Sequence, residues 1–387
     1  MSALSHPPTS ESPPATAPPA SNSPSPPAAH SWAYVQRDAR DLRVDFLRGF
    51  CAFAMVVDHL GGASFLYPLT GGNAFYASAA EGFIFLSGLM VGLIYGRRID
   101  RDGLATVQMR LLRRALTLYA VTLGLTFVFV GLSRLAGMPW LQDVEPLTPQ
   151  LAISLITLHH TYYLVDVMLL YTLLLAISPL ALLLLHTRHS AWLVGMSIAL
   201  WAAHLAFSAQ AAVPWEIVNN DTFRVSAWQL WFFVGMAIGY HWDAVRTRLG
   251  RIPRQPAIVT LAALAIGLVV LRLVGPSDTV PFFDKHYAAP GRVFAFAVYF
   301  PLLYIVLTLA WVPLARVAGW LLLPFGQNAL YVYAMHLFAI FFAALVLPYV
   351  PGFDRGNAVM NGLVQVLAVL GIWLLVKRQV LFDVIPR

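Results

Sequence analysis

Apolar residues dominate the chain after residue 40, where they form long runs separated by short polar segments. An α-helix needs about 20 mostly apolar residues to cross the hydrocarbon core of a bilayer, and the runs are of this kind. A membrane β-barrel would show short segments of alternating polarity instead. The pattern therefore predicts an all-α polytopic membrane protein.

We expect about ten transmembrane helices. Their predicted positions are 44–66, 76–96, 112–133, 162–185, 190–208, 224–242, 256–274, 292–313, 328–348 and 358–379. Cytoplasmic loops of membrane proteins are enriched in Lys and Arg. With the N-terminus inside, 19 of the 25 Lys and Arg residues fall on the cytoplasmic side. This bias favours a topology with both termini in the cytoplasm (N-in, C-in).

The amino-acid composition excludes other classes of protein. Of the 387 residues, 59% are hydrophobic and only 11% are charged, which excludes a water-soluble globular protein. The formal charge of +7 fits cytoplasmic loops, so we expect the lipid bilayer as a partner and no nucleic acid. Cys51 is the single cysteine, so no disulfide can form within the chain.

Residues 1–36 are rich in Pro, Ser and Ala and contain no apolar run. Such a composition cannot bury enough apolar surface to offset the entropy of ordering, so we predict a disordered cytoplasmic tail. The tail lacks the basic start and apolar core of a secretory signal peptide, and the first apolar run is therefore expected to remain as a span. Residues 37–387 form the predicted integral membrane domain.

The first predicted span contains both Arg48 and His59. Eleven residues of helix bring the two side chains to one face, about 16 Å apart along the axis. A cation at the cytoplasmic mouth, aligned with an imidazole deeper in the bilayer, suits a tunnel that joins a cytosolic anionic donor to proton-transfer chemistry. A snorkelling arginine and a structural histidine would explain the same spacing.

Acidic residues in the first two spans need partners, because a charge inside a membrane is costly. Asp58 points about 100° away from His59, so it is poorly placed as a partner of that histidine and could pair with another helix. Glu81 is expected to bind His59 or an arginine. Gly88 and Gly92 form a small-xxx-small pattern that permits close helix packing.

The fourth and ninth spans add Asp166, Tyr333 and His336. Tyr333 and His336 are three residues apart and share a helix face, although a packing role would also explain His336. His159 and His160 lie before the fourth span, but no acid or cysteine follows at ligand spacing, so we expect no metal.

Several motifs recur in a fixed order along the chain. They are Arg48-Gly49 with His59, Glu81 with Phe85-Leu86-Ser87-Gly88, Arg114 to Tyr119, and Gly326 with Tyr333 and His336. This set resembles the acyltransferase-3 superfamily of integral membrane acyltransferases. Thr117 and Leu330 stand where that superfamily often has Pro and Tyr.

Further motifs are similar to one branch of the superfamily, the OpgC family, which is known for succinylating osmoregulated periplasmic glucans. They are Asp41-Leu42-Arg43 leading to Asp45, Asp58-His59, Ala80-Glu81, Tyr163 with Asp166 and Tyr171, Trp228-Gln229 with Gly235, and Leu323 to Asn328. The segment 75–79 lacks an acidic residue that OpgC proteins tend to carry. The resemblance covers nearly the whole chain after the tail.

The resemblance implies a multi-pass acyltransferase of the bacterial inner membrane. It would move an acyl group, succinyl being favoured, from cytosolic acyl-CoA to a hydroxyl of a periplasmic or cell-envelope glycan. Acyl-CoA, which includes succinyl-CoA, is thus the expected donor, and the glycan is the expected acceptor.

The same resemblance implies roles for individual residues. His59 is the expected general base, with Glu81, His336 and Asp58 as further catalytic residues. The expected substrate-binding residues are Arg48, Arg113 and Arg114, which would neutralise CoA phosphates, together with Asp45, Asp166, Tyr333 and Asn328.

A proton-coupled transporter or flippase of a small solute or glycan precursor is the alternative from another class. It would also place His, Asp and Glu inside a helical bundle. Many transporters contain inverted repeats with broken helices, and the chain shows no matching pair of Gly/Pro-interrupted segments.

Overall fold

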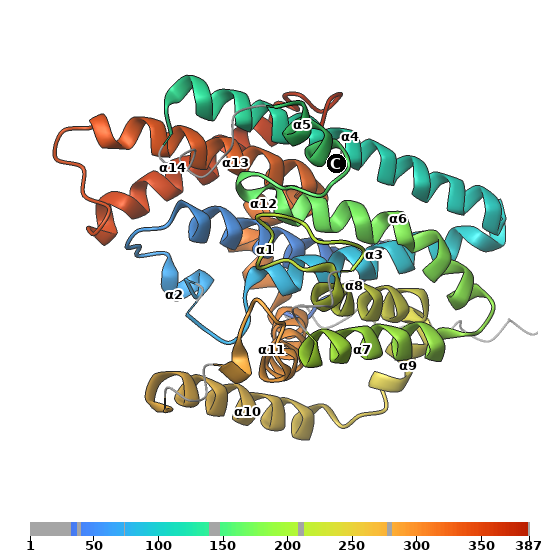
Figure 1. Ribbon diagram of the computed structural model, residues 1–387. Helices are drawn as coiled ribbons and strands as arrows, with labels where there is room; N and C mark the ends of the chain where they lie inside the picture. The colour runs from blue at the N-terminus through green and yellow to red at the C-terminus, as the bar shows by residue number, and fades with distance from the viewer. Residues whose placement is uncertain are drawn as a thin grey trace, which may run out of the picture.

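The computed structural model describes residues 32–36, 40–72, 74–138, 148–207, 213–276 and 281–385 (Figure 1). Most of the predicted tail, residues 1–31, lies outside them. The described residues form no β-strand, and their main elements are helices. These are α1 (Leu42–Leu60), α2 (Tyr67–Thr70), α3 (Ala79–Asp102), α4 (Leu104–Ala136), α5 (Pro149–Ile156), α6 (Asp166–His186), α7 (Ser190–Ala206), α8 (Val225–Tyr240), α9 (Trp242–Leu249), α10 (Arg254–Val274), α11 (Pro290–Leu309), α12 (Trp311–Gln327), α13 (Ala329–Val346) and α14 (Ala358–Lys377).

The predicted all-α membrane class is confirmed. Seven of the described helices are long and apolar enough to cross a bilayer, namely α3, α4, α6, α10, α11, α13 with the turn after it, and α14. Helix α1 carries four charged residues, and α7 and α8 have 17 and 16 residues, so these three fall short of that criterion. The count of ten spans and the N-in, C-in orientation stay predictions.

Each predicted span coincides with a helix, and α12 is an additional one. It occupies the segment between the predicted spans 292–313 and 328–348. Arg316, Pro324 and two glycines interrupt its apolar pattern, which explains why the sequence suggested a loop.

Helix α1 lies inside the bundle and packs against α3, α12, α13 and α14. Two glycines allow its backbone to approach α12. A Cβ atom at Gly49 would lie 1.8 Å from the carbonyl oxygen of Leu322, and one at Gly326 would lie 1.7 Å from that of Asp45. Any larger residue at either position would therefore force α1 and α12 apart.

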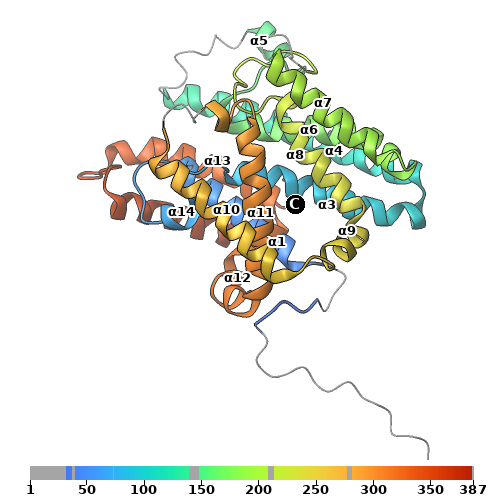
Figure 2. The same cartoon turned by 90° about the horizontal axis from the view of Figure 1, so that it is seen from below.

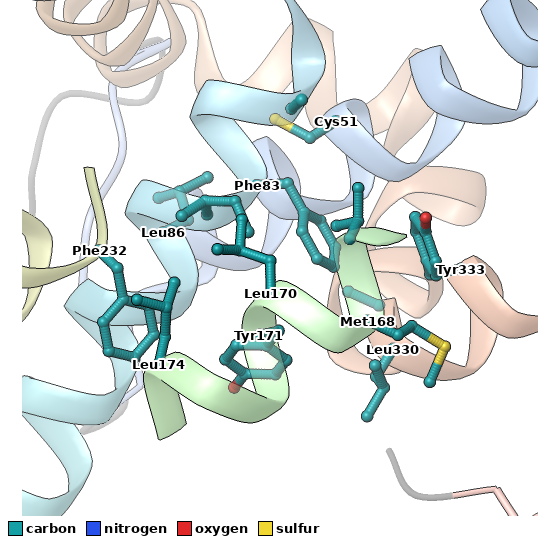
Figure 3. Packing of buried hydrophobic residues seen from close by; sticks show 14 of the residues in the cluster. Cys51, Phe83, Leu86, Met168, Leu170, Tyr171, Leu174, Phe232, Leu330 and Tyr333 are labelled. Atoms are coloured by element: carbon teal, nitrogen blue, oxygen red, sulfur yellow. The ribbon is translucent and has the colours of Figure 1, made fainter. Parts of the chain in front are cut away.

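Helices α3 and α8 also pack closely through glycines, which lie on both helices. Cβ atoms at Gly88 and Gly92 of α3 would lie 2.0 Å from carbonyl oxygens of α8, and those at Gly235 and Gly239 would lie 2.3 and 2.0 Å from carbonyl oxygens of α3. The close packing predicted from Gly88 and Gly92 is confirmed. On α8, Phe232 packs against Leu174 and Tyr171 of α6 in the apolar core (Figure 3).

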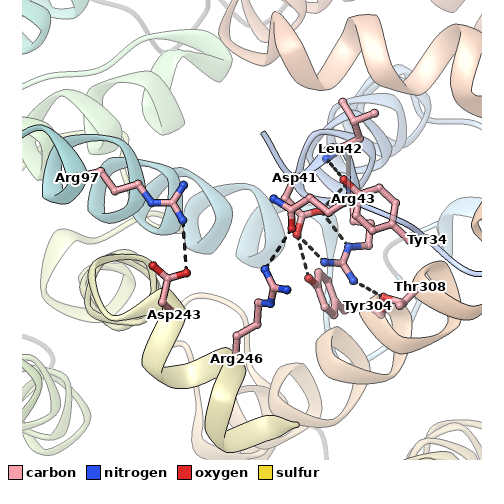
Figure 4. Close-up of polar contacts among 10 residues, drawn as sticks. Tyr34, Asp41, Leu42, Arg43, Arg97, Asp243, Arg246, Tyr304 and Thr308 are labelled. Carbon is pink, nitrogen blue, oxygen red and sulfur yellow. Dashed lines mark hydrogen bonds and ion pairs between the residues drawn. The ribbon is translucent and has the colours of Figure 1, made fainter. Parts of the chain in front are cut away.

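The start of α1 is fixed by a charged and aromatic cluster (Figure 4). The Arg43 guanidinium binds Asp41 at 2.7 Å and lies 4.3 and 4.6 Å from the ring centroids of Tyr34 and Tyr304. The amide of Tyr34 donates to the carbonyl of Thr308 at 2.8 Å. Residues 32–36, the end of the predicted tail, thus lie along the junction between α11 and α12.

Helices α10 and α11 form an outer pair (Figure 2). They have a small apolar cluster of their own, in which Tyr76 and Phe283 stack with ring centroids 3.5 Å apart. Because α11 also contacts α1 and α3, it connects this pair to the interior of the bundle.

Replacement of Gly88 by Leu should destabilise the protein by about 1–3 kcal/mol or more, because the new side chain meets the α8 backbone. Thermal unfolding of the purified protein in detergent measures the effect as a lower Tm. Gly267→Leu is the matched control, because a Cβ atom at Gly267 of α10 meets nothing within 4 Å. Equal losses of Tm in both variants would contradict the packing of α3 on α8.

Candidate active site

Two histidines from distant parts of the chain meet inside the bundle. His59 lies in the last turn of α1, and His336 lies in α13. Their Nδ1 and Nε2 atoms, respectively, are 3.0 Å apart. His336 is buried, whereas His59 remains half-buried. The structure therefore brings together two of the predicted catalytic residues.

The hydrogen bonds of this pair define which nitrogens carry protons. Nδ1 of His336 bonds to the carbonyl oxygen of Tyr333, which can only accept. Nδ1 of His336 is therefore the donor, and its Nε2 accepts from Nδ1–H of His59 in the neutral pair. The lone pair on Nε2 of His59 is left free, since no described residue hydrogen-bonds to that atom.

Tyr333 holds α13 in this register. Its hydroxyl donates to the carbonyl of Leu164 at 2.6 Å, and its ring centroid lies 4.6 Å from that of His336. The side chain is buried. It thus contacts the imidazole pair through packing and the backbone, while its hydroxyl is used by the turn Tyr163–Val165 before α6. The side chain of Tyr163 lies outside the described residues.

Asp58 and Asp166, two of the three predicted aspartates, lie in this region without bonding to either histidine. Asp58 accepts a hydrogen bond from the hydroxyl of Thr70 at 2.8 Å. Asp166 begins α6, and its carboxylate accepts from the amide of Val167 at 2.8 Å. The sequence analysis judged Asp58 poorly placed as a partner of His59, and its observed partner on α2 agrees with that.

Glu81 pairs with an arginine, one of the two alternatives left open by the sequence. It is fully buried and bonds Arg292 of α11. It also forms a capping box with Ser78, whose amide donates to it at 2.9 Å. These bonds join α3 to α11, and none of them goes to His59 or His336.

Sequence reasoning missed two cations of this region, Arg292 and Lys285. Lys285 lies in the segment before α11, half-buried, with its ammonium 5.6 Å from the ring centroid of Phe223. Burial lowers the pKa of Lys285, and the negative charge of Glu81 opposes that shift. The sequence does contain one signal for Lys285, namely that lysine is rare in this chain. Lys285 and Lys377 are its two lysines.

A second group of predicted residues lies at the other end of α1. Arg48 is half-buried, and its Nε atom is buried without a hydrogen-bond partner. Its electrostatic neighbours include Tyr171, Asp45 and Arg114. Asp45 is already held by Arg40 at 2.8 Å, so it does not close an ion pair with Arg48.

The two arginines of α4 differ in position. Arg114 is half-buried and interacts with Tyr171 and Tyr95, whereas Arg113 is exposed. The guanidinium of Arg98 lies 5.9 Å from the ring centroid of Tyr95, which extends this cationic group to the surface. Arg48 of α1 and Arg114 of α4 thus lie close enough to interact electrostatically, and Tyr171 of α6 interacts with both; we call this group the cationic lining.

Asn328 forms no hydrogen bond with a described residue of either group. Its side-chain amide donates to the carbonyl of Pro324 at 2.9 Å, at the junction between α12 and α13. This junction contacts α1 through Gly326 and Asp45. In the described part of the chain, no group of three or more His, Cys, Asp or Glu side chains is arranged to hold a metal ion.

The site therefore has two ends on one helix. Arg48 and His59 share a face of α1, about 16 Å apart along its axis, with a cationic lining at one end and the imidazole pair at the other. The sequence model of the OpgC protein family matches residues 40–382. No curated protein matches the chain. Because the family match runs from just before α1 to beyond α14, this chain belongs to the OpgC protein family.

Proposed function

We propose that this protein is an integral membrane O-acyltransferase of the acyltransferase-3 type. It moves an acyl group, with succinyl favoured, from cytosolic acyl-CoA to a hydroxyl of a periplasmic or cell-envelope glycan. Membership of the OpgC family supports this class of reaction. The observation that carries the proposal is the order of hydrogen bonds at His336 and His59. It leaves Nε2 of His59 free to accept a proton, as a general base must.

The proton chain explains how His59 acts. Nε2 of His59 removes the proton of the acceptor hydroxyl while the oxygen attacks the thioester carbonyl. The new C–O bond replaces the C–S bond, and the CoA thiolate leaves with the proton from His59. Throughout, Nδ1–H of His59 donates to His336. His336 thus orients the base and stabilises the imidazolium that forms, as the third member of a catalytic triad does.

The cationic end of α1 suits the donor. Arg48 and Arg114 are half-buried guanidiniums, and Asp45, the carboxylate near Arg48, is occupied by Arg40. Two neighbouring guanidiniums can bind an anion, and guanidinium forks fit phosphate oxygens well. With phosphates of CoA bound there, the extended pantetheine arm would carry the thioester along α1 toward His59.

In this proposal, donor and acceptor approach from opposite sides of the inner membrane. In the predicted N-in orientation, Arg48 faces the cytoplasm, and His59 lies toward the periplasmic half of the bilayer. The catalytic group then lies where an envelope glycan reaches it, while CoA stays in the cytosol. A proton-coupled transporter or flippase would use the same titratable residues to move an unmodified solute, and acyl-CoA consumption separates the two functions.

We expect His59→Ala to lower kcat for acyl transfer by about 10²- to 10⁴-fold, because positioned proton transfer contributes that much to catalysis. The assay measures acyl-CoA consumption by protein in nanodiscs with a neutral glucan as acceptor, and mass spectrometry of the glucan identifies the product. His189→Ala is the control, because the His189 side chain is exposed and hydrogen-bonds only to Thr187 in the described chain. Full activity of His59→Ala would exclude His59 as the base. A wild type that moves solute and leaves acyl-CoA intact would support the transporter.

Arg48→Ala should raise the KM for acyl-CoA by about 10- to 100-fold, since a charged hydrogen bond is worth about 1.5–3 kcal/mol. Arg114→Ala should have a larger effect on this KM than Arg113→Ala, because Arg113 is exposed. Steady-state kinetics with varied acyl-CoA measure both effects. Arg251→Ala, an exposed arginine after α9, serves as the control. An unchanged KM in Arg48→Ala at normal protein levels would contradict phosphate binding by this residue.

A further inference from the structure

Three charged side chains beside His59 have no place in the proton chain. Asp58 comes from α1, Asp166 from the start of α6, and Lys285 from the segment before α11. We call these three residues the charged cradle. Each is half-buried, as is His59. Asp166 follows Leu164 by two residues, and the carbonyl of Leu164 accepts from the hydroxyl of Tyr333, whose ring contacts that of His336.

The cradle has unused hydrogen-bonding capacity. Asp58 accepts from Thr70, and Asp166 accepts from the amide of Val167, each through one carboxylate oxygen. In the described part of the chain, the second oxygen of each carboxylate has no donor. The ammonium of Lys285 has neither a hydrogen bond nor an ion pair with any described residue; its contact is with the ring of Phe223. Two carboxylate oxygens and an ammonium with three donors are therefore available to a ligand.

Charge balance limits what the charged cradle can bind. Lys285 interacts electrostatically with Asp58, Asp166 and Glu81, but Glu81 is already neutralised by Arg292 in a buried pair. The two remaining carboxylates outnumber the single ammonium. An additional carboxylate or phosphate would be repelled, whereas an uncharged group that both donates and accepts hydrogen bonds would be satisfied. Sugar hydroxyls are groups of this kind.

The position of the cradle relates it to the base. Lys285 acts electrostatically on His59, and Asp58 adjoins His59 in sequence. A sugar held by the cradle would present a neighbouring hydroxyl to Nε2 of His59. The cradle lies at the end of α1 opposite Arg48, away from the cationic lining for the donor.

We propose that Asp58, Asp166 and Lys285 bind the hydroxyls of an uncharged sugar residue of the acceptor and hold one hydroxyl at His59. The inference rests on the proposed acyltransferase function and assigns the acceptor subsite within it. The aspartates accept hydrogen bonds from the sugar, and Lys285 donates to it. All three residues bind and position the acceptor, and the proton transfer belongs to His59.

The test combines binding and kinetics for Lys285→Met, Asp58→Asn and Asp166→Asn. The first readout is calorimetric binding of a neutral glucan oligosaccharide to the protein in nanodiscs, without acyl-CoA. The others are the KM for the glucan, the KM for acyl-CoA, and the rate of acyl-CoA hydrolysis without glucan. We expect each variant to weaken glucan binding and raise its KM by about 10- to 100-fold, with the donor KM and hydrolysis unchanged.

Two controls accompany these variants. Lys377→Met removes the other lysine of the chain, which lies near Trp373 at the end of α14, and it should leave all readouts unchanged. Lys285→Arg keeps the charge and the donors and should recover part of the binding, which separates loss of contact from misfolding.

The outcomes distinguish the two proposals. Equal glucan binding by the wild type and Lys285→Met, or no glucan binding by the wild type, would overturn the cradle. A raised donor KM in Lys285→Met, or an altered preference between succinyl-CoA and acetyl-CoA, would also overturn it, because Lys285 would then contact the acyl group. Glucan binding that depends on the cradle, in a wild type that never consumes acyl-CoA, would support the cradle and contradict the acyltransferase.

Discussion

The cost of placing charged side chains inside a membrane is the constraint on which this structure depends. A charged group near the bilayer centre costs from about 2.5 kcal/mol upward, and α1 carries Arg43, Asp45, Arg48 and Asp58. The surrounding helices keep these side chains away from lipid. Gly49 and Gly326 allow close backbone contact between α1 and α12. Helix α3 covers another side of α1 and packs in turn against the glycines of α8. The charges are thereby kept inside the protein, where they can bind ligands.

The enclosed polar groups separate into two environments along α1. At one end, Arg48 and Arg114 lie among tyrosines and form a cationic lining, which suits phosphates. At the other end, a hydrogen-bonded pair of imidazoles lies near two aspartates and a lysine, which suits proton transfer to and from an uncharged polar molecule. Under the proposed function, this one helix would connect an anionic donor on one side of the membrane with a neutral acceptor on the other. The rigid link between the two ends is the α1 backbone itself.

The sequence predicted the local features well and the long-range contacts poorly. Helix positions follow from apolar run length, so each predicted span coincides with a helix, whereas α12 was missed because Arg316 and Pro324 interrupt its run. Local geometry also predicted that Arg48 and His59 share a face. The contact between His59 and His336 joins residues 277 positions apart, so no spacing rule could reveal it. Lys285 was missed because a residue outside the regular helices has no periodicity to show where its side chain points.

The central claim is that the hydrogen-bond order from Tyr333 through His336 leaves Nε2 of His59 unprotonated and free. Nitrogen-15 NMR of histidine-labelled protein in nanodiscs measures this directly, with His59→Ala and His336→Ala identifying the two rings. At neutral pH, the structure predicts a proton on Nδ1 and none on Nε2 for both residues. A proton on Nε2 of His59, with Nδ1 unprotonated, would contradict its assignment as the general base.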